Sequence, residues 1–270
     1  MMNPSNHSGR LSRKNSYRRN WSIPLLEVIS LGLWGVLLLK SWLTGELSLL
    51  IHPNYFSLVV ITGVILLLIS GLRLSQLLKL ERQHRLGKGV TRPVVQHTTL
   101  FPPSWSSGFL IATAMVGLIV TPKAFTSQTA LHRGIADAPT ITRSQPQSFR
   151  SASNPEKRTL IEWIKLLNVY PEPDAYTGQK VKVDGFVVIP PNLPPDHLLI
   201  SRFVITCCAA DAYPLGLPVK LTENRNDYPS DTWIEVEGQM ITETLDDKRQ
   251  LVIEATGIKK IPEPENPYYY

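Results

Sequence analysis

The sequence predicts a membrane-anchored α+β protein, in which N-terminal transmembrane helices precede a small OB-like β-barrel with one flanking helix. Two apolar segments, at about 23–43 and 55–78, are each long enough to cross about 30 Å of hydrocarbon as a helix. The second half changes to short strands with period-two alternation. The charge changes too: residues 155–270 hold 12 Lys and Arg against 18 Asp and Glu, whereas residues 1–154 hold 16 against 4.

The apolar segments define a predicted transmembrane region over residues 21–122. A third apolar run at about 105–122 adds a further span, and a buried or interfacial helix is the alternative for it. Residues 1–20 carry five basic groups and no acid, which predicts a disordered tail. A cleaved signal peptide is the rival interpretation of 23–43, but this run exceeds the usual length of about 7–15 residues and no small-residue cleavage site follows it.

The distribution of positive charge predicts the orientation of these helices. The basic tail and the basic loop 79–104 belong on the cytoplasmic side, because cytoplasmic loops are enriched in Lys and Arg. The short link between the first two spans carries Glu46 and no basic residue, so we expect it outside the cytoplasm. Everything after Thr121 is then also outside. We therefore expect a membrane protein, in contact with lipid, with a cytoplasmic N-terminus and an extracytoplasmic C-terminal domain.

The C-terminal half divides into a linker at 123–154, a β domain at 155–262 and a tail at 263–270. The linker is rich in Ser, Thr, Gln and Pro and has no periodicity. In the domain, apolar residues recur at helical spacing from Leu160 to Leu167 and precede the strands. The predicted strands are 180–189, 198–208, 218–221, 233–241 and 251–255. Gly185 and Gly238 suit the tight bends of a small barrel, and a β-sandwich is the alternative.

The two cysteines of the chain, Cys207 and Cys208, are adjacent at the predicted end of a strand, and Asp211 follows them. Adjacent side chains on a regular strand point to opposite faces, so they can share a metal only if the strand has ended or bulged. Three interpretations stay open: buried structural thiols, a redox pair, or a site for zinc or another thiophilic metal formed by Cys207, Cys208, Asp211 and His197. Asp211 is also expected to close the turn after the strand. Arg202 is expected to pair with an acid or face a partner.

Other functional classes find little support in the residues. The sequence holds no nucleophile triad, paired-carboxylate motif or phosphate-binding glycine loop, so we do not expect an enzyme, and no cofactor is implied apart from the metal alternative. The acidic C-terminal half argues against nucleic acid as a partner, because such readers need positive charge on the folded domain. An OB-type module that binds an envelope glycan is a further hypothesis.

The cysteine stretch carries a family resemblance. Arg202-Phe203-x-Ile205-x-Cys207-Cys208-x-Ala210-Asp211-Ala212 resembles the signature of a bacterial family described as a permease subunit. The resemblance extends to the stretches 176–187 and 233–238 and to His132-Arg133-Gly134. It implies a protein of the bacterial inner (plasma) membrane, built as a membrane hairpin with an exported domain that accompanies a polytopic permease. We therefore expect an accessory subunit of a transporter, with Arg202, Cys207, Cys208 and Asp211 as its functional motif, and an extracytoplasmic thiol-redox or metal-handling protein as the alternative.

Overall fold

The structure is a computed structural model that describes residues 22–86, 103–135 and 155–270. The predicted tail at 1–20 lies outside the described residues, as do most of the basic loop and the second part of the predicted linker. The chain divides into two compact units. We call residues 1–44 and 57–121 the helical unit, and residues 45–56 and 122–270 the sheet unit.

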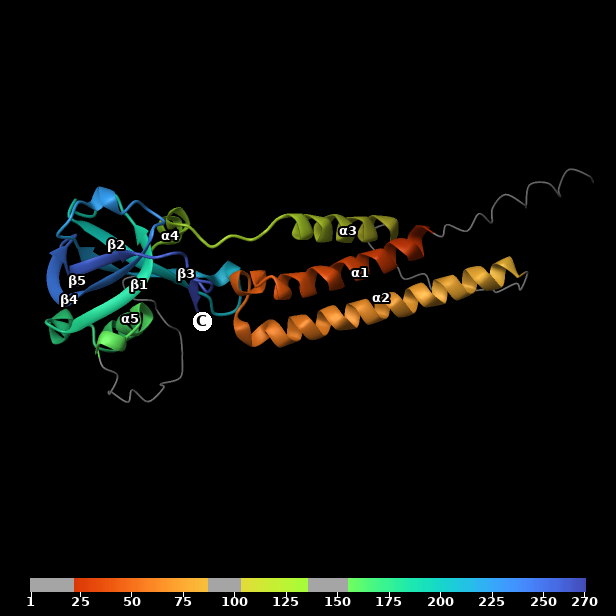
Figure 1. Cartoon of the computed structure of the whole chain (residues 1–270), viewed down its shortest axis with the longest axis horizontal. Coiled ribbons are helices and arrows are strands. Elements are labelled where there is room, and N and C mark those ends of the chain that lie inside the picture. Colours follow the sequence, from red (N-terminus) through yellow and green to blue (C-terminus); the bar gives the residue numbers. More distant parts are fainter. Residues whose placement is uncertain (1–21, 87–102, 136–154) are drawn as a thin grey trace, which may run out of the picture. The chain divides into compact units, whose positions relative to one another are not determined.

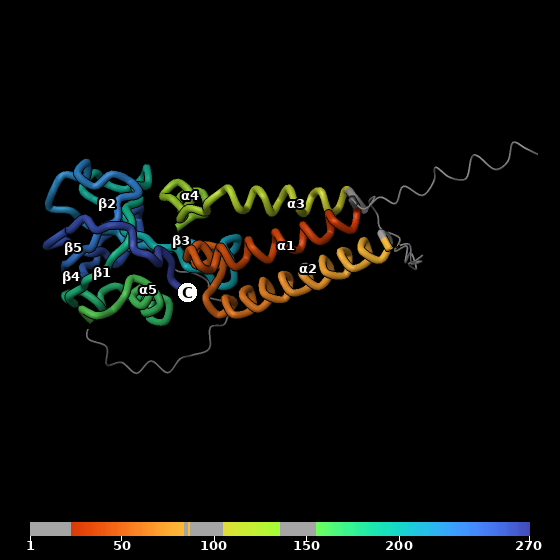
Figure 2. Tube along the Cα trace, turned by 45° about the vertical axis from the view of Figure 1, so that its right-hand side comes forward, coloured from red at the N-terminus to blue at the C-terminus, as the bar shows by residue number. Residues whose placement is uncertain are grey.

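The helical unit is built from α1 (Ser22–Leu43), α2 (Phe56–Arg85) and α3 (Pro103–Ile119). These three helices run alongside one another in both views (Figure 1, Figure 2). Within the described residues, the segments Ile23–Leu43 and Pro53–Gln83 are long and apolar enough to cross a membrane. Only 17% and 11% of their apolar windows are buried, unlike a core helix of a soluble protein. The two helices therefore fit a membrane anchor. The apolar part of α3, Trp105–Ile119, is shorter.

Small residues let α1 and α2 approach closely. A Cβ atom added to Gly35 would lie 2.8 Å from the Leu67 side chain and 3.0 Å from the Gly63 carbonyl oxygen. The Ser70 hydroxyl donates a hydrogen bond of 2.9 Å to the Val28 carbonyl. Close backbone approach at glycine, together with a hydroxyl bond between helices, is typical of helix pairs in an apolar environment. The sequence of this pair is therefore suited to the hairpin that the apolar segments predicted.

The described residues of the sheet unit form one six-stranded sheet and two helices of seven residues or more. Its strands are β1 (Lys180–Val188), β2 (His197–Val204), β3 (Tyr213–Lys220), β4 (Trp233–Leu245), β5 (Lys248–Lys260) and β6 (Tyr268–Tyr269). The strand order is β1-β4-β5-β3-β2-β6, and β1 also pairs with β2, so each of the first five strands has at least two neighbours. All five predicted strands are present, although β2 ends at Val204 and leaves both cysteines beyond it.

Two glycines permit the bends that the sequence predicted. A Cβ at Gly238 would lie 2.1 Å from the Glu254 carbonyl oxygen, at the point where the register of β4 and β5 shifts between Glu237 and Gly238. A Cβ at Gly185 would lie 2.6 Å from the Ser201 carbonyl oxygen, where β1 crosses from β4 to β2. Since real Cβ atoms do not approach backbone oxygen so closely, only glycine fits either position without a shift of the backbone.

Two apolar clusters form the core of the sheet unit. The larger joins the strands to α5 (Leu160–Val169), whose Trp163 and Ile164 are fully buried. Thr159 and Glu162 form a capping box at the start of α5, which satisfies the first free backbone amides. The smaller cluster packs Phe186, Phe203 and Trp233 against α4 (Ser127–Arg133) and its flanking residues.

Two domain boundaries differ from the sequence prediction. Residues 123–135 were predicted as linker, but Ala130 is fully buried in the smaller cluster, and the Phe125 amide donates to the Tyr268 hydroxyl at 2.9 Å. Residues 263–270 were predicted as a tail, but Tyr268 and Tyr269 form β6, parallel to β2. Both errors have one cause: neither segment has a periodic pattern, and each is ordered by aromatic contacts with strands that are distant in the sequence.

Candidate functional site

The two cysteines lie in a loop that leaves the end of β2. Ile205 is fully buried, and the chain then bends at Thr206 and Cys207 before a 3₁₀ turn at Ala209–Asp211 leads into β3. Because the strand has ended, the two thiols are not held on opposite faces, and their Sγ atoms are 3.6 Å apart. Both are free thiols; Cys207 is exposed and Cys208 is partly exposed. We call residues 206–211 the thiol loop.

Asp211 organises the backbone of the thiol loop. Its carboxylate accepts hydrogen bonds from the amide of Cys207 at 2.8 Å, from the amide of Cys208 at 3.2 Å and from the hydroxyl of Thr206. Partial burial acts to raise the pKa of Asp211, but these hydrogen bonds outweigh it and lower the pKa to about 2. The carboxylate therefore has the turn-closing contacts that the sequence predicted and is ionised at neutral pH.

The negative charge of Asp211 acts on the neighbouring thiol. The pKa of Cys207 is raised to about 11, first by its hydrogen bond to Asp211 and then by its hydrogen bond to Cys208. At neutral pH the group is thus a protonated thiol, whereas reactive cysteines usually have a lowered pKa and a positive environment. The arrangement disfavours Cys207 as a nucleophile. A bound cation would reverse this effect, because positive charge stabilises thiolates.

The thiol loop brings together three potential metal ligands. The Sγ atoms of Cys207 and Cys208 and a carboxylate oxygen of Asp211 all lie within 4.8 Å of one another. Among the described residues, no other group of three or more His, Cys, Asp or Glu side chains has its ligand atoms so close together. Two sulfur donors and one oxygen donor suit a borderline or soft ion such as Zn²⁺.

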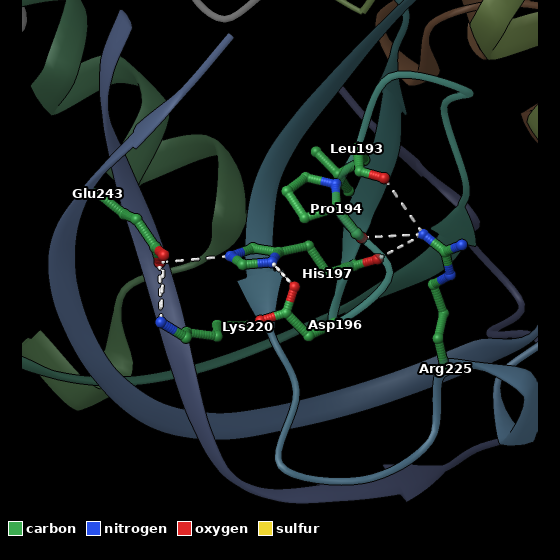
Figure 3. A network of polar contacts seen from close by, with 7 residues as sticks. All are labelled: Leu193, Pro194, Asp196, His197, Lys220, Arg225 and Glu243. Atoms are coloured by element: carbon green, nitrogen blue, oxygen red, sulfur yellow. Dashed lines mark hydrogen bonds and ion pairs between the residues drawn. The ribbon is translucent and has the colours of Figure 1, made fainter. Parts of the chain in front are cut away.

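The structure does not bring His197 to this group. His197 lies at the opposite end of β2, and the seven steps along that strand alone span about 23 Å. Its side chain is 2% exposed, with Nδ1 2.8 Å from Asp196 and Nε2 3.3 Å from Glu243 (Figure 3). Lys220 bonds the same Glu243 carboxylate at 3.1 Å. His197 is therefore not a ligand in this arrangement, and the prediction that included it in the metal set is corrected.

The contacts of Arg202 are likewise with residues outside the thiol loop. Its side chain is 9% exposed, and Nη1 donates to the Asp184 carboxylate at 3.0 Å while Nη2 donates to the Asn266 carbonyl at 2.8 Å. The guanidinium lies over the rings of Trp233 and Tyr269, at 5.3 and 4.5 Å from their centroids. The predicted pairing with an acid is thus present. A buried arginine held in this way joins β1, β2 and the C-terminal residues, and it is not available to a partner.

Another arginine, Arg133 at the end of α4, contacts the backbone where the thiol loop leads into β3. Its guanidinium donates to the carbonyl of Ala212 and, at 3.4 Å, to the carbonyl of Ala209. It also lies 4.7 Å from the centroid of the Phe125 ring. The loop carbonyls would otherwise face solvent at the end of a strand. Arg133 therefore orders the backbone that carries both cysteines.

The segment between α1 and α2 covers the loop from another direction. Ile51 forms an antiparallel bridge with Cys208, the His52 amide donates to the Cys207 carbonyl at 3.0 Å, and the Ala209 amide donates to the Leu50 carbonyl at 2.8 Å. Sequence reasoning missed this contact, since an eleven-residue link with no strand pattern gives no sign of pairing. The distinctive His132-Arg133-Gly134 stretch was a usable signal for Arg133, although its composition assigned it no role.

The part of the chain that contains the thiol loop matches a known domain. Residues 156–270 match the DUF1980 C-terminal domain. The DUF1980 match contains the whole thiol loop, whereas α4 and the α1–α2 segment precede it. The chain is also 26% identical over 104 residues to the UPF0703 protein YcgQ of Bacillus subtilis (strain 168), an alignment that covers 38% of this chain. The aligned part of the chain spans 36% of the length of that relative, or about a third. Together the two matches support a bacterial family whose names state no activity.

Proposed function

We propose that this protein is a membrane-anchored accessory subunit that binds a thiophilic metal ion on the extracytoplasmic side, at Cys207, Cys208 and Asp211. The observation that carries the proposal is the spacing of three donor atoms, all within 4.8 Å of one another, on a loop whose backbone is fixed from several directions. The electrostatics of the loop favour a cation. The Asp211 carboxylate, with a pKa of about 2, is negative at neutral pH, and the pKa of the neighbouring Cys207 thiol is raised to about 11. A bound cation would be attracted by the carboxylate and would stabilise the thiolate.

The metal interpretation is preferred over the thiol-redox alternative for a chemical reason. Thiol–disulfide exchange needs an attacking thiolate, and the environment of Cys207 keeps this group protonated. Metal binding instead removes the proton itself, because the ion binds the thiolate and releases H⁺. Binding should therefore strengthen as the pH rises.

The test of metal binding uses the full chain in mild detergent. Purified protein is reduced, freed of metal with a chelator and titrated with Zn²⁺ or Co²⁺ while bound metal is counted. We expect one ion per chain, and no specific ion in the C207S/C208S variant, whose folding is checked by circular dichroism. Equal metal binding by the two proteins would refute the proposal.

The proposed topology has support from both units. The apolar helices α1 and α2 suit a membrane anchor, and the basic residues at 79–104 favour the cytoplasm. Independently, the segment 45–56 pairs with the thiol loop, which requires the link between the two spans and the sheet unit to share one side of the membrane. Introduced thiols can test this topology, because Cys207 itself is held in the protonated form. In the C207S/C208S background, a membrane-impermeant maleimide should label a cysteine introduced at the exposed Lys259 on intact cells, and should label a cysteine introduced at Ser12 only after the cells are permeabilised.

We further propose that the sheet unit is an OB-like barrel. The pairings β1-β4, β4-β5, β5-β3, β3-β2 and β2-β1 return to their first strand, and glycines stand at the two positions of closest backbone approach. Amide exchange gives a test. In a closed barrel β1 pairs with β4 over residues 180–186 and with β2 over residues 186–188, so its amides should be protected along the whole strand. Rapid exchange of the Phe186–Val188 end alone would favour an open sheet.

A polytopic permease is the proposed partner of the anchor. The specific observation is the exposed apolar surface of α2, where Leu58, Leu68 and Leu72 are more than 60% exposed. Such a surface can be covered by lipid or by the helices of another membrane protein. Crosslinking from a photoreactive residue at Leu68 in native membranes, followed by identification of the adduct, distinguishes them. A polytopic transporter is expected, and labelling of lipid alone would remove this part of the proposal.

A further inference from the structure

The thiol loop presents three ligand atoms from one short stretch, whereas zinc in structural sites is almost always held by four. The segment that pairs with this loop contains a histidine, His52, which comes from the link between the two long apolar helices. His52 therefore lies beside the thiol loop although it precedes Cys207 by 155 positions in the chain.

Backbone pairing brings His52 opposite Cys207. The bridge joins Ile51 to Cys208, so the next pair along the two antiparallel segments is His52 with Cys207, and the amide of the first donates to the carbonyl of the second at 3.0 Å. Residues opposite each other in such a pair have Cβ atoms about 5 Å apart. A side chain of histidine length can span this separation.

One nitrogen of the His52 imidazole is held by a hydrogen bond. Nδ1 accepts a hydrogen bond of 3.1 Å from the Asn54 amide, and the ring edge packs against Tyr270 with 5.4 Å between centroids. The Nε2 atom has no hydrogen bond to any described residue. Tyr270 in turn donates to the Ser48 carbonyl at 2.8 Å, which fixes the C-terminus on the same segment.

We propose that His52 supplies the fourth ligand, so that a thiophilic ion is held by two thiolates, the Asp211 carboxylate and the His52 imidazole. This inference rests on the metal-binding function proposed above. Binding of the divalent ion releases one proton from each thiol. The His52 ring turns toward Cys207, its proton moves from Nε2 to Nδ1, the hydrogen bond from Asn54 is given up, and Nε2 donates its lone pair to the ion.

The consequence is a metal-dependent tie, within the sheet unit, between the link at residues 45–56 and the thiol loop. Residues 45–56 are continuous with α1 at Leu43 and with α2 at Phe56, so an ion bound by both His52 and the thiol loop fixes the connection between the two helices. Without the ion, the two backbone hydrogen bonds of the Ile51–Cys208 bridge hold the link to the thiol loop. With it, a coordination bond is added, and the fraction of molecules that have this bond rises with the extracytoplasmic metal concentration.

Cobalt(II) absorption of the full-length protein in detergent tests the assignment, because tetrahedral coordination and thiolate ligation have separate bands. We expect tetrahedral d–d bands with charge transfer from two thiolates in the native protein. In H52Q we expect at least a tenfold weaker affinity and altered d–d bands with the thiolate bands kept. H132Q, a change at an exposed histidine on α4, is the matched control and should behave as the native protein.

The H52C variant gives a test that does not depend on a loss of metal affinity. A cysteine at this position should restore four-coordinate binding and increase the thiolate charge-transfer intensity by about half, as the number of thiolates rises from two to three. If H52Q and H52C both retain native spectra and affinity, the role of His52 is refuted while the metal site stands. If the native protein forms no thiolate–cobalt complex, the proposed function itself fails.

Discussion

The two ends of β2 carry the two clusters of ionisable groups that the sequence could not tell apart, and they differ in how their polar atoms are satisfied. At the start of the strand, His197 is buried with a carboxylate on each ring nitrogen, and Lys220 and Arg225 complete the network (Figure 3). Beyond its end, Cys207 is exposed and both thiols are free.

This difference teaches how to separate a structural polar cluster from a binding site. A buried network in which each group has a partner specifies the packing around it, and its members are not available to a ligand. The thiol loop has the reverse arrangement: its backbone is held by Asp211, Arg133 and the α1–α2 segment, while Cys207 is exposed, Cys208 is partly exposed and both thiols are free. Rigid support with free donors is what a ligand site requires.

The largest effect should come from removing both thiols. We expect C207S/C208S to lower the affinity for Zn²⁺ by at least 100-fold, because serine hydroxyls are poor zinc ligands. The change in the free energy of unfolding without metal should be below about 0.5 kcal/mol, since the site is at the surface. Isothermal calorimetry and urea unfolding measure the two quantities. Severe unfolding of the double variant would instead make the thiols structural and remove the contrast with His197.

The opposite pattern is expected at the other end of β2. H197A should cost about 2–4 kcal/mol of stability, because it leaves the carboxylates and Lys220 without the buried group between them. Zinc affinity should stay within about twofold of the native value, since the cluster is remote. D196A, at a side chain that is 53% exposed, is the matched control and should cost less than about 1 kcal/mol. A loss of zinc binding in folded H197A would contradict the separation of the two ends.

Asp211 sets the reactivity of the exposed thiol. The D211N variant replaces the carboxylate whose hydrogen bond with the thiol is the first cause of the raised pKa of Cys207, so this pKa should fall from about 11 toward its ordinary value of 9.0. Each unit of that fall multiplies the thiolate fraction at pH 8 by about ten. Alkylation of Cys207 by iodoacetamide, followed by peptide mass spectrometry, should accelerate accordingly. An unchanged rate would mean that the carboxylate does not control the thiol.

Arg133 should affect the same site more weakly. In R133K the charge remains, but a single ammonium cannot reproduce the guanidinium contacts with the carbonyls of Ala209 and Ala212. We expect zinc affinity to fall about three- to tenfold through disorder of the loop, with thiolate bands unchanged in the cobalt spectrum. R249K, on a remote arginine paired with Asp174, is a suitable control. Equal affinities in the two variants would show that α4 does not position the thiols.

The smallest expected effect is the acid dependence of stability. The pKa of Asp211 is about 2 in the folded protein and about 3.9 when unfolded, so its contribution is complete above pH 4 and is lost as the pH falls toward 2. Because the carboxylate is partly exposed, the contribution is at most about 1 kcal/mol. The stability difference between native protein and D211N should therefore shrink between pH 4 and pH 2. A difference that persists at pH 2 would assign the effect to packing instead.

Much of the fold follows from local patterns in the sequence. The apolar runs predict α1 and α2 because length and hydropathy alone decide whether a helix can lie in hydrocarbon. Alternation predicts the five main strands, and Gly238 marks the bend in β4. The same local signals fail for residues 123–135 and for Tyr268 and Tyr269, which have no period of their own.

The functional assignment shows where local pattern ends and tertiary structure begins. Residue types and adjacency were sufficient to single out Cys207, Cys208 and Asp211, because cysteine and carboxylate side chains carry their chemistry wherever they lie. Their spatial relation to the two histidines was not readable. His197 is only ten positions from Cys207, but an extended strand carries the two apart, whereas His52 is brought beside Cys207 by pairing between distant segments. The path of the backbone determines which residues are close in space. Packing between segments that are distant in the sequence sets that path in the sheet unit.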